Sequence, residues 1–249
     1  MSEKRRTFCL LLHGFNGEPL DMQELEHELR DAGFDARTLL LPGHGTTARD
    51  FAAHGWDDWL GEVRAETQRA LTRYERVFVI GHSLGAALTL AVAAREPEVA
   101  GIVALCPPTR LNPRLGALVR RLQNMVPYIP SWGEDVRDRL GARRRYARSA
   151  YRWTALKTVH SLYEALPGLR AALPTVRCPA LIIAARHDHV VPARDAEEAY
   201  RLIGSQRKEL VILERSFHAV TKDVERHIVF ERTIAFCQRE SAPHTPVIL

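Results

Sequence analysis

Three residues far apart in the chain have the types that nucleophilic catalysis requires. Ser83 lies at the centre of Gly81-His-Ser-Leu-Gly85, and Asp188 and His218 follow it in that order. A serine hydroxyl becomes a strong nucleophile when a histidine accepts its proton, and a carboxylate fixes the tautomer of that histidine and stabilises its charged form. These three residues therefore suit attack by Ser83, acid–base catalysis by His218 and orientation of His218 by Asp188.

The pentapeptide stands between an apolar run, Val77–Ile80, and a helical run rich in alanine and leucine that extends to Ala94. A serine on a sharp strand-to-helix turn needs minimal side chains two positions away on each side, and Gly81 and Gly85 provide them. Amides at the start of the helix favour negative charge beside Ser83. A bare G-x-S-x-G is common, but this setting predicts a nucleophile elbow.

The predicted strands place the other two residues near the serine. Asp188 is the first acid past a strand predicted at Ala180–Ala185, and His218 lies in the loop after a strand predicted at Glu209–Leu213. Carboxyl ends of parallel strands share one edge of a sheet, so both residues converge on Ser83. Asp188 by itself suits a turn and His218 a helix cap. The three together, in order, predict a catalytic triad.

Two backbone N–H groups are predicted to form the oxyanion hole. Leu84 directly follows the nucleophile. Phe15 lies in the loop His13–Gly17, which follows a strand predicted at Thr7–Leu12. The glycines of that loop allow its backbone to approach a reacting centre.

Apolar strands alternate with amphipathic helices along most of the chain. Strands are predicted at Thr7–Leu12, Ala36–Leu41, Val77–Ile80, Ala100–Cys106, Ala180–Ala185 and Glu209–Leu213. Helices are predicted at Leu20–Ala32, from a cap at Asp57 or Asp58 to Tyr74, after the elbow, at Ala193–Ile203 and at Val220–Arg239. This pattern predicts an α/β fold with a mostly parallel sheet of about six strands flanked by helices.

The alternation stops between Pro108 and Val176. About 65 residues without a strand-like run are too many for a plain connection in a compact domain. Three helices are predicted there instead, at Leu115–Met125, Val136–Arg152 and Thr154–Leu166, the last ending at Pro167. Segment 108–176 is thus predicted to be a helical cap, inserted in a core of residues 1–107 and 177–249 and lying over the carboxyl ends of the strands.

Aromatic side chains in the cap could line an acyl pocket. The candidates are Trp132, Tyr128 and Tyr163, together with Val190 beside Asp188. Packing of the cap on the core explains each aromatic residue equally well, so both interpretations stay open.

Basic residues concentrate in the predicted cap. The chain has a net charge of +5, and residues 108–176 hold 13 Arg and Lys against four Asp and Glu. Such a patch is compatible with nucleic acid, an acidic membrane surface or the phosphates of a CoA thioester. A solvated helical face is the simpler interpretation, because no nucleic-acid-binding motif accompanies the charge.

The cysteines and histidines outside the triad do not indicate a metal or a cofactor. None of the four cysteines, Cys9, Cys106, Cys178 and Cys237, is spaced C-x-x-C, and we expect free, mostly buried thiols. His187 and His189 could share a metal, but no third ligand is evident nearby.

Hydropathy indicates a soluble, cytoplasmic protein. The apolar fraction of 46% is ordinary for a globular chain. No stretch approaches the roughly 18 apolar residues of a membrane span. The apolar run Phe8–Leu12, behind the charged N-terminal residues, is too short for a signal-peptide core.

Six motifs together resemble those of the α/β-hydrolase superfamily, in particular small bacterial carboxylesterases and monoacylglycerol lipases. They are Leu12-His-Gly-Phe15, Pro42-Gly-His-Gly45, Asp57-Asp-Trp59, Gly81-His-Ser-Leu-Gly85, Ala185-Arg-His-Asp188 and Ser216-Phe-His218. The resemblance covers nearly the whole chain. It implies the α/β-hydrolase fold, a small helical cap, and hydrolysis of short- to medium-chain esters or monoacylglycerols through an acyl-enzyme on Ser83, without metal or cofactor.

The chain departs from that family at Ala86, where a second glycine is frequent, and in its arginine-rich cap. Substrate preference is therefore the least transferable property. A small-molecule ester is the expected partner, with no nucleic acid and no stable membrane span, while oligomeric state, acyl length and alcohol stay open.

Other functions use the same fold. A thioesterase or acyltransferase would use the same triad, as would a peroxidase-like or C–C-bond-cleaving enzyme. A non-catalytic receptor is disfavoured, because a binder has no need of all three triad residues.

Overall fold

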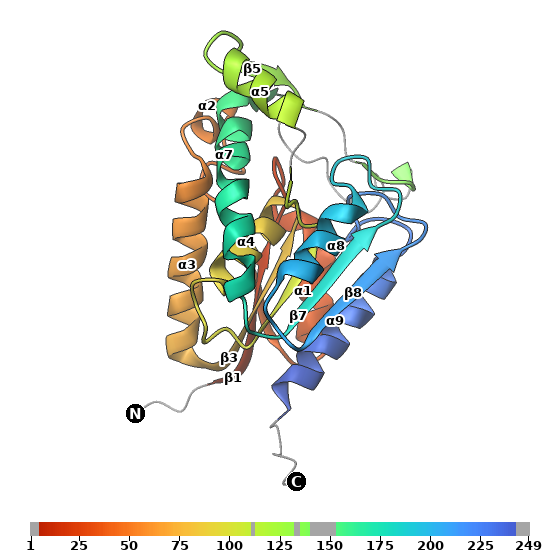
Figure 1. Cartoon of the computed structure of the whole chain (residues 1–249). Helices are drawn as coiled ribbons and strands as arrows, with labels where there is room; N and C mark the ends of the chain where they lie inside the picture. The colour runs from red at the N-terminus through yellow and green to blue at the C-terminus, as the bar shows by residue number, and fades with distance from the viewer. Residues whose placement is uncertain (1–4, 111–112, 132–134, 140–152, 243–249) are drawn as a thin grey trace.

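The structure is a computed structural model that describes residues 5–110, 113–131, 135–139 and 153–242. Six strands form one sheet in the order β2-β1-β3-β4-β7-β8. Their bounds are β1 Arg5–Leu12, β2 Asp35–Leu39, β3 Tyr74–His82, β4 Gly101–Leu105, β7 Ala180–Ala185 and β8 Lys208–Leu213. All neighbouring strands run parallel, so their carboxyl ends lie along one edge, uppermost in Figure 1. The predicted parallel sheet is confirmed.

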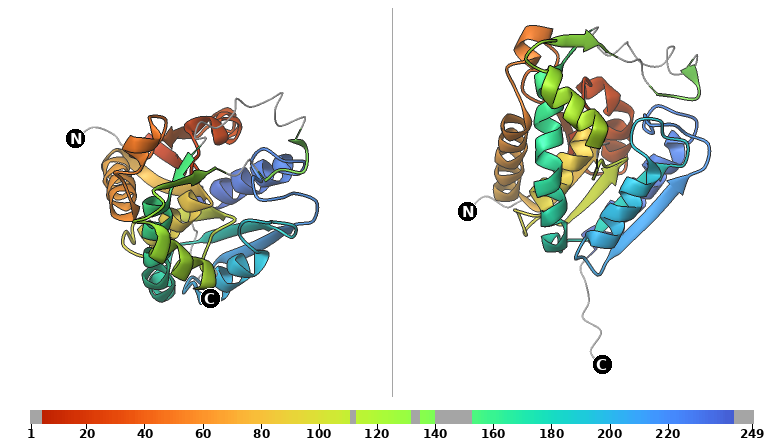
Figure 2. Two further views of the ribbon diagram at one scale, coloured as in Figure 1. Left: turned by 90° about the horizontal axis from the view of Figure 1, so that it is seen from above. Right: turned by 45° about the horizontal axis from the view of Figure 1, so that its top comes forward.

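Helices cover both faces of this sheet (Figures 1 and 2). Their bounds are η1 Pro19–Asp21, α1 Gln23–Asp31, α2 Ala48–Phe51, α3 Trp56–Arg73, α4 Leu84–Ala93, α5 Pro113–Leu122, α7 Leu156–Ala172, η2 Leu173–Thr175, α8 Ala193–Leu202 and α9 Arg226–Ser241. Alternate strand residues point to opposite faces. Leu10 and Leu12 join the core cluster that includes α3, α4 and α8. Cys9 and Leu11 join the cluster with α1 and α9.

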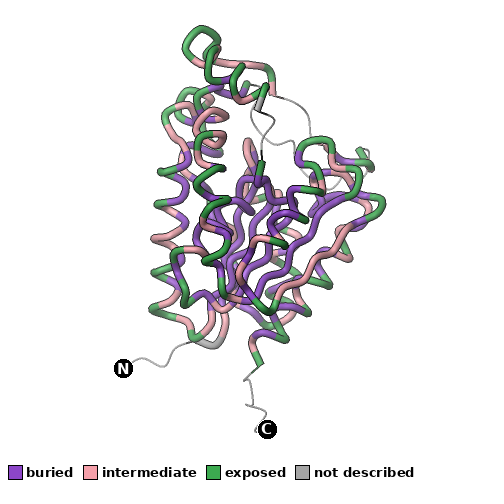
Figure 3. The backbone as a smooth tube through the Cα atoms, in the orientation of Figure 1, coloured by how far each residue is buried: buried purple, intermediate pink, exposed green. Residues whose placement is uncertain are grey.

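Of the helices that the structure describes, the elbow helix α4 is the most deeply buried. All ten of its residues are buried, which explains a sequence made almost entirely of alanine, leucine and other apolar residues. Figure 3 shows the same concentration of burial in the sheet behind it. None of the helices among the described residues has the length and apolarity to cross a bilayer.

The start of α3 corrects the predicted cap. Gly55 is the N-cap residue and Trp56 begins the helix, so neither Asp57 nor Asp58 caps it. The carboxylate of Asp58 instead reaches back from the third helical position and accepts a bond from the Gly55 N–H at 2.9 Å. Asp58 thus still stabilises the helix start, because it satisfies a backbone donor outside the first turn.

The last helix begins later than predicted. It starts at Arg226, whereas the start was predicted at Val220. The intervening Asp223 and Glu225 use their carboxylates to accept N–H groups from neighbouring loops. Side chains committed in this way favour turns over a continuous helix.

The segment between β4 and β7 contains strands as well as helices. β5, Tyr128–Pro130, pairs antiparallel with β6, Trp153–Ala155, so the expectation of no strand in this segment was wrong. Three-residue strands this far apart in sequence leave no periodic pattern. α5 and β5 lie beyond the carboxyl edge of the main sheet (Figure 1). Most of the predicted helix Val136–Arg152, namely 140–152, lies outside the described residues.

α7 continues past the residue that was predicted to end it. Pro167 lies inside the helix, which runs on to Ala172. A proline in a helix interior costs about 3 kcal/mol. Leu166 and Leu169 flank it and are both buried against the core, and this burial offsets the cost.

Candidate active site

Ser83 sits on a backbone turn that few residues adopt. Its φ of 54° and ψ of −113° lie in the positive-φ region, between β3 and α4. A Cβ added at Gly81 would overlap the Gly85 carbonyl, and one added at Gly85 would lie 2.7 Å from the carbonyl oxygen of His13. Both elbow glycines are therefore required, because strand, turn and helix backbones pass in direct contact.

The structure brings the three candidate catalytic residues together. His218 Nδ1 lies 2.7 Å from Oδ2 of Asp188, and His218 Nε2 lies 2.9 Å from Oγ of Ser83. An ionised carboxylate only accepts hydrogen bonds, so Nδ1 carries the proton and Nε2 has a free lone pair. The Ser83 hydroxyl donates to that lone pair, which is the geometry of a nucleophile joined to its base.

Asp188 is held in its charged form. Burial raises the pKa of its carboxyl, but the bond from His218 and the N–H groups of Val190 and Val191 outweigh burial and place the pKa below its usual value. Those two amides donate to Oδ1 at 2.8 and 2.7 Å. Asp188 is thus a fully buried carboxylate with both oxygens occupied.

The segments that carry the two predicted oxyanion donors both lie beside Ser83. Leu84 is the first residue of α4, where backbone N–H groups have no partner inside the helix. On the other side, a Cβ at Gly14 would lie 3.5 Å from Cβ of Ser83, so the loop that contains Phe15 passes directly over the nucleophile. The geometry suits an oxyanion hole, and that role remains a prediction.

Several family motif residues support this loop from below. Buried His13 donates from Nδ1 to the Gly14 carbonyl at 3.0 Å and accepts the Leu41 N–H at Nε2, at 3.2 Å. His44 packs edge-on against His13, and burial lowers the pKa of His44 to about 3. Trp59 donates from Nε1 to the Pro42 carbonyl at 3.0 Å. The motifs thus form a neutral, closely packed floor under the oxyanion loop.

Sequence reasoning missed the groups that hold His218 in place. His82 donates from Nε2 to the His218 carbonyl at 2.9 Å, and burial lowers the pKa of His82 to about 4. Glu225 accepts the N–H groups of the three residues before Phe217. Asp135, from the inserted segment, accepts the N–H of His218. His82 could have been noticed because it lies inside the elbow motif, whereas the two acids had no motif to mark them.

The described residues contain one cluster with metal-ligand chemistry. Ligand atoms of His82, Cys106 and His218 lie within 4.8 Å of one another. Both ring nitrogens of His218 and Nε2 of His82 are already hydrogen-bonded. This arrangement fits a hydrogen-bonded triad better than it fits a metal. The four cysteines are free, as predicted, and three of them are buried.

The described residues among those predicted to line an acyl pocket lie in different environments. Tyr163 packs against Gly116, where a Cβ would lie 2.7 Å from Cδ1 of the ring, so it joins α7 to α5. Tyr128 is half-buried in β5, and Val190 is exposed. Trp132 lies outside the described residues. Their pocket role therefore remains a prediction.

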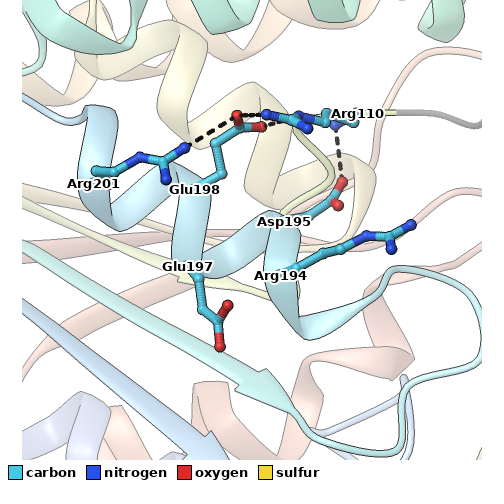
Figure 4. A pocket seen from close by; sticks show the side chains of 6 residues that line it. All are labelled: Arg110, Arg194, Asp195, Glu197, Glu198 and Arg201. Atoms are coloured by element: carbon cyan, nitrogen blue, oxygen red, sulfur yellow. Dashed lines mark hydrogen bonds and ion pairs between the residues drawn. The ribbon is translucent and has the colours of Figure 1, made fainter.

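A pocket on α8 is separate from the triad. Its lining consists of Arg110, Arg194, Asp195, Glu197, Glu198 and Arg201. Glu198 accepts a bond from Arg110 Nε at 2.6 Å and another from Arg170 at 2.8 Å. In Figure 4 the Glu198 carboxylate lies between the guanidinium groups of Arg110 and Arg201, with which it is paired, whereas Arg194 points away from it.

Comparison with known proteins places this geometry in context. The family described as "Serine aminopeptidase, S33" matches residues 3–225. The thermostable monoacylglycerol lipase of Bacillus sp. (strain H-257) is 31% identical, with 91% of this chain and 88% of that protein covered. A carboxylesterase of Bacillus subtilis (strain 168) is 24% identical, with 92% of both chains covered.

One solved structure is also similar to this chain over nearly its whole length. It belongs to work on LipS and LipT, two metagenome-derived lipolytic enzymes, and superposes with a TM-score of 0.88 at 33% identity, covering 96% of both chains.

Proposed function

The chain belongs to the hydrolase family described as serine aminopeptidase, S33, and on that premise we propose that Ser83, His218 and Asp188 hydrolyse carboxylic esters through an acyl-enzyme. The observation that carries the proposal is the continuous hydrogen-bond chain from Ser83 Oγ through His218 to Asp188, at 2.9 and 2.7 Å. The enzyme is thus a carboxylesterase of the α/β-hydrolase fold.

The reaction follows from these contacts. His218 Nε2 takes the Ser83 proton as Oγ attacks the ester carbonyl, and the same nitrogen then protonates the departing alcohol. Asp188 stabilises the imidazolium that forms between these steps. The N–H groups of Phe15 and Leu84 stabilise the oxyanion. Water activated by His218 then releases the acid from Ser83.

Monoacylglycerols and short- to medium-chain esters are the substrates we propose. Support comes from the similarity to a monoacylglycerol lipase over 91% of the chain. We also propose that the enzyme acts in the cytoplasm, where free cysteines such as these four persist. Nucleic acid is not an expected partner, because no nucleic-acid-binding motif accompanies the basic segment, and two of its arginines, Arg110 and Arg170, pair with Glu198.

Replacement of the nucleophile tests the mechanism. Ser83→Ala should lower kcat for p-nitrophenyl butyrate by about 10⁵–10⁶-fold, because the covalent step is lost. Far-UV circular dichroism and the melting temperature check that the variant folds. Retention of more than a small fraction of wild-type turnover by folded Ser83→Ala would contradict the proposal.

A substrate panel tests the class. Monoacylglycerols of increasing acyl length, acyl-CoA thioesters and amino-acid p-nitroanilides should be compared by kcat/KM. We expect the ester substrates to exceed both other classes by at least about tenfold, which corresponds to about 1.4 kcal/mol of transition-state discrimination. Preference for acyl-CoA that weakens with salt would instead assign a thioesterase.

A further inference from the structure

The inserted segment makes direct contact with the triad loops at residues 135–139. In Figures 1 and 2 this short stretch lies beside the loops that follow β7 and β8, far from α5 and β5 of the same segment. Those two loops carry Asp188 and His218. Residues 135–139 therefore lie where they can influence the positions of Asp188 and His218.

Asp135 binds both loops with a single carboxylate. Oδ2 accepts the backbone N–H of His189 at 3.1 Å and the backbone N–H of His218 at 3.2 Å. Oδ1 accepts a bond from His189 Nδ1 at 2.9 Å. The Asp135 carbonyl also accepts the N–H of Ala219 at 3.0 Å. The side chain is only 16% exposed, so these contacts are largely shielded from water.

A second carboxylate fixes the stretch from the other side. Fully buried Asp223 accepts the N–H groups of Arg137 at 2.9 Å and of Phe217 at 2.7 Å on Oδ2. Its Oδ1 accepts the N–H of Asp138 at 3.2 Å. The Arg137 guanidinium also lies 4.9 Å from the centre of the Phe217 ring. The stretch is thus held firmly enough to give Asp135 one position.

The consequence for the triad is geometric. Asp188 holds the N–H groups of residues 190 and 191, and Asp135 holds that of residue 189 next to them. Asp135 therefore binds both the loop that carries Asp188 and the backbone of His218. We propose that Asp135 is a positioning residue, which sets the His218–Asp188 contact and keeps Nε2 aimed at Ser83. Preorganisation of this kind matters because small displacements of a catalytic group cost up to about 100-fold in rate.

Two variants test this position. Asp135→Asn keeps an oxygen for the two backbone N–H groups, whereas Asp135→Ala removes it. Asp135→Ala should lower kcat for p-nitrophenyl butyrate by about 100-fold with KM little changed. Asp135→Asn should restore most of that loss and stay within about tenfold of wild type.

The control is Glu62→Gln, which removes a carboxylate charge from a partly exposed side chain paired with Arg69 on α3. It should leave kcat unchanged. The proposal is overturned if both Asp135 variants stay within twofold of the wild-type kcat. It is also overturned if the activity lost in Asp135→Ala equals its unfolded fraction, so that kcat per folded molecule is unchanged.

This inference rests on the catalytic roles proposed for the triad, and the outcomes can be told apart. Turnover by folded Ser83→Ala would overturn those roles. Inactive Ser83→Ala together with unaffected Asp135 variants would overturn only the positioning role of Asp135.

Discussion

The core around the elbow and the segment inserted between β4 and β7 are built by different kinds of contact. In the core, backbone meets backbone, as where Gly85 lies against the carbonyls of Leu12 and His13. In the inserted segment, helices contact each other through side chains, as where the Tyr163 ring packs against Gly116. The difference indicates that a side chain added at the elbow would meet fixed backbone, whereas one added at the contact between α5 and α7 would meet a side chain.

Paired glycine substitutions test this comparison and should give the largest effect. Gly85→Ala places a Cβ against fixed backbone, so we expect a loss of at least about 4 kcal/mol of stability or failure to fold. Gly116→Ala meets only the Tyr163 ring, which can turn away, and should change stability by about 1 kcal/mol or less. Urea denaturation of both variants measures the contrast, and equal losses would erase it.

Two buried histidines of the core should make the protein less stable as the pH falls from 6.5 toward 4. The pKa of buried His44 is lowered to about 3 and that of His82 to about 4. Between pH 6.5 and these values the unfolded chain binds protons that the folded chain does not. Stability therefore falls with falling pH, by on the order of 1.4 kcal/mol per pH unit for each histidine.

Thermal unfolding from pH 7 to pH 5 measures this loss. His44→Gln removes one titrating group and should flatten the slope, even if its stability at pH 7 is lower. A melting temperature that is constant from pH 7 to pH 5 would contradict the prediction.

The Glu198 carboxylate, which joins the inserted segment to α8, should lose its contribution to stability at lower pH than the two histidines do, and the loss should be smaller. Bonds from Arg110, then Arg170 and Thr109, outweigh burial and lower the pKa of Glu198 to about 2. This carboxylate stabilises the fold at pH values above about 4.5, and the stabilisation is lost as pH falls toward 2. Glu198 joins both ends of the inserted segment to α8.

Glu198→Gln keeps the shape of the side chain but removes its charge. We expect a loss of about 1–3 kcal/mol at pH 7, because its arginine partners are partly exposed and screened by solvent. Urea denaturation at pH 7 and pH 4 measures it. Exposed Glu231→Gln, on α9, serves as the control, and an equal loss in both variants would remove the special role of Glu198.

Much of the core could be predicted from the sequence, because its signals are local. Apolar runs such as Ala180–Ala185 identify buried strands, and the strained turn at Ser83 demands glycines at fixed spacing. The carboxyl ends of parallel strands lie at one edge of the sheet. The positions of Ser83, Asp188 and His218 just past those ends were therefore enough to predict that they meet. Both physical requirements act over a few residues and leave a pattern.

Only the tertiary structure decided the inserted segment and its link to the triad. Asp135 contacts His218 across 83 positions of sequence, through backbone groups that every residue possesses. α7 passes through Pro167 because burial on the core outweighs a local preference. Contacts between distant segments follow from the fold as a whole, so no nearby residue type announces them.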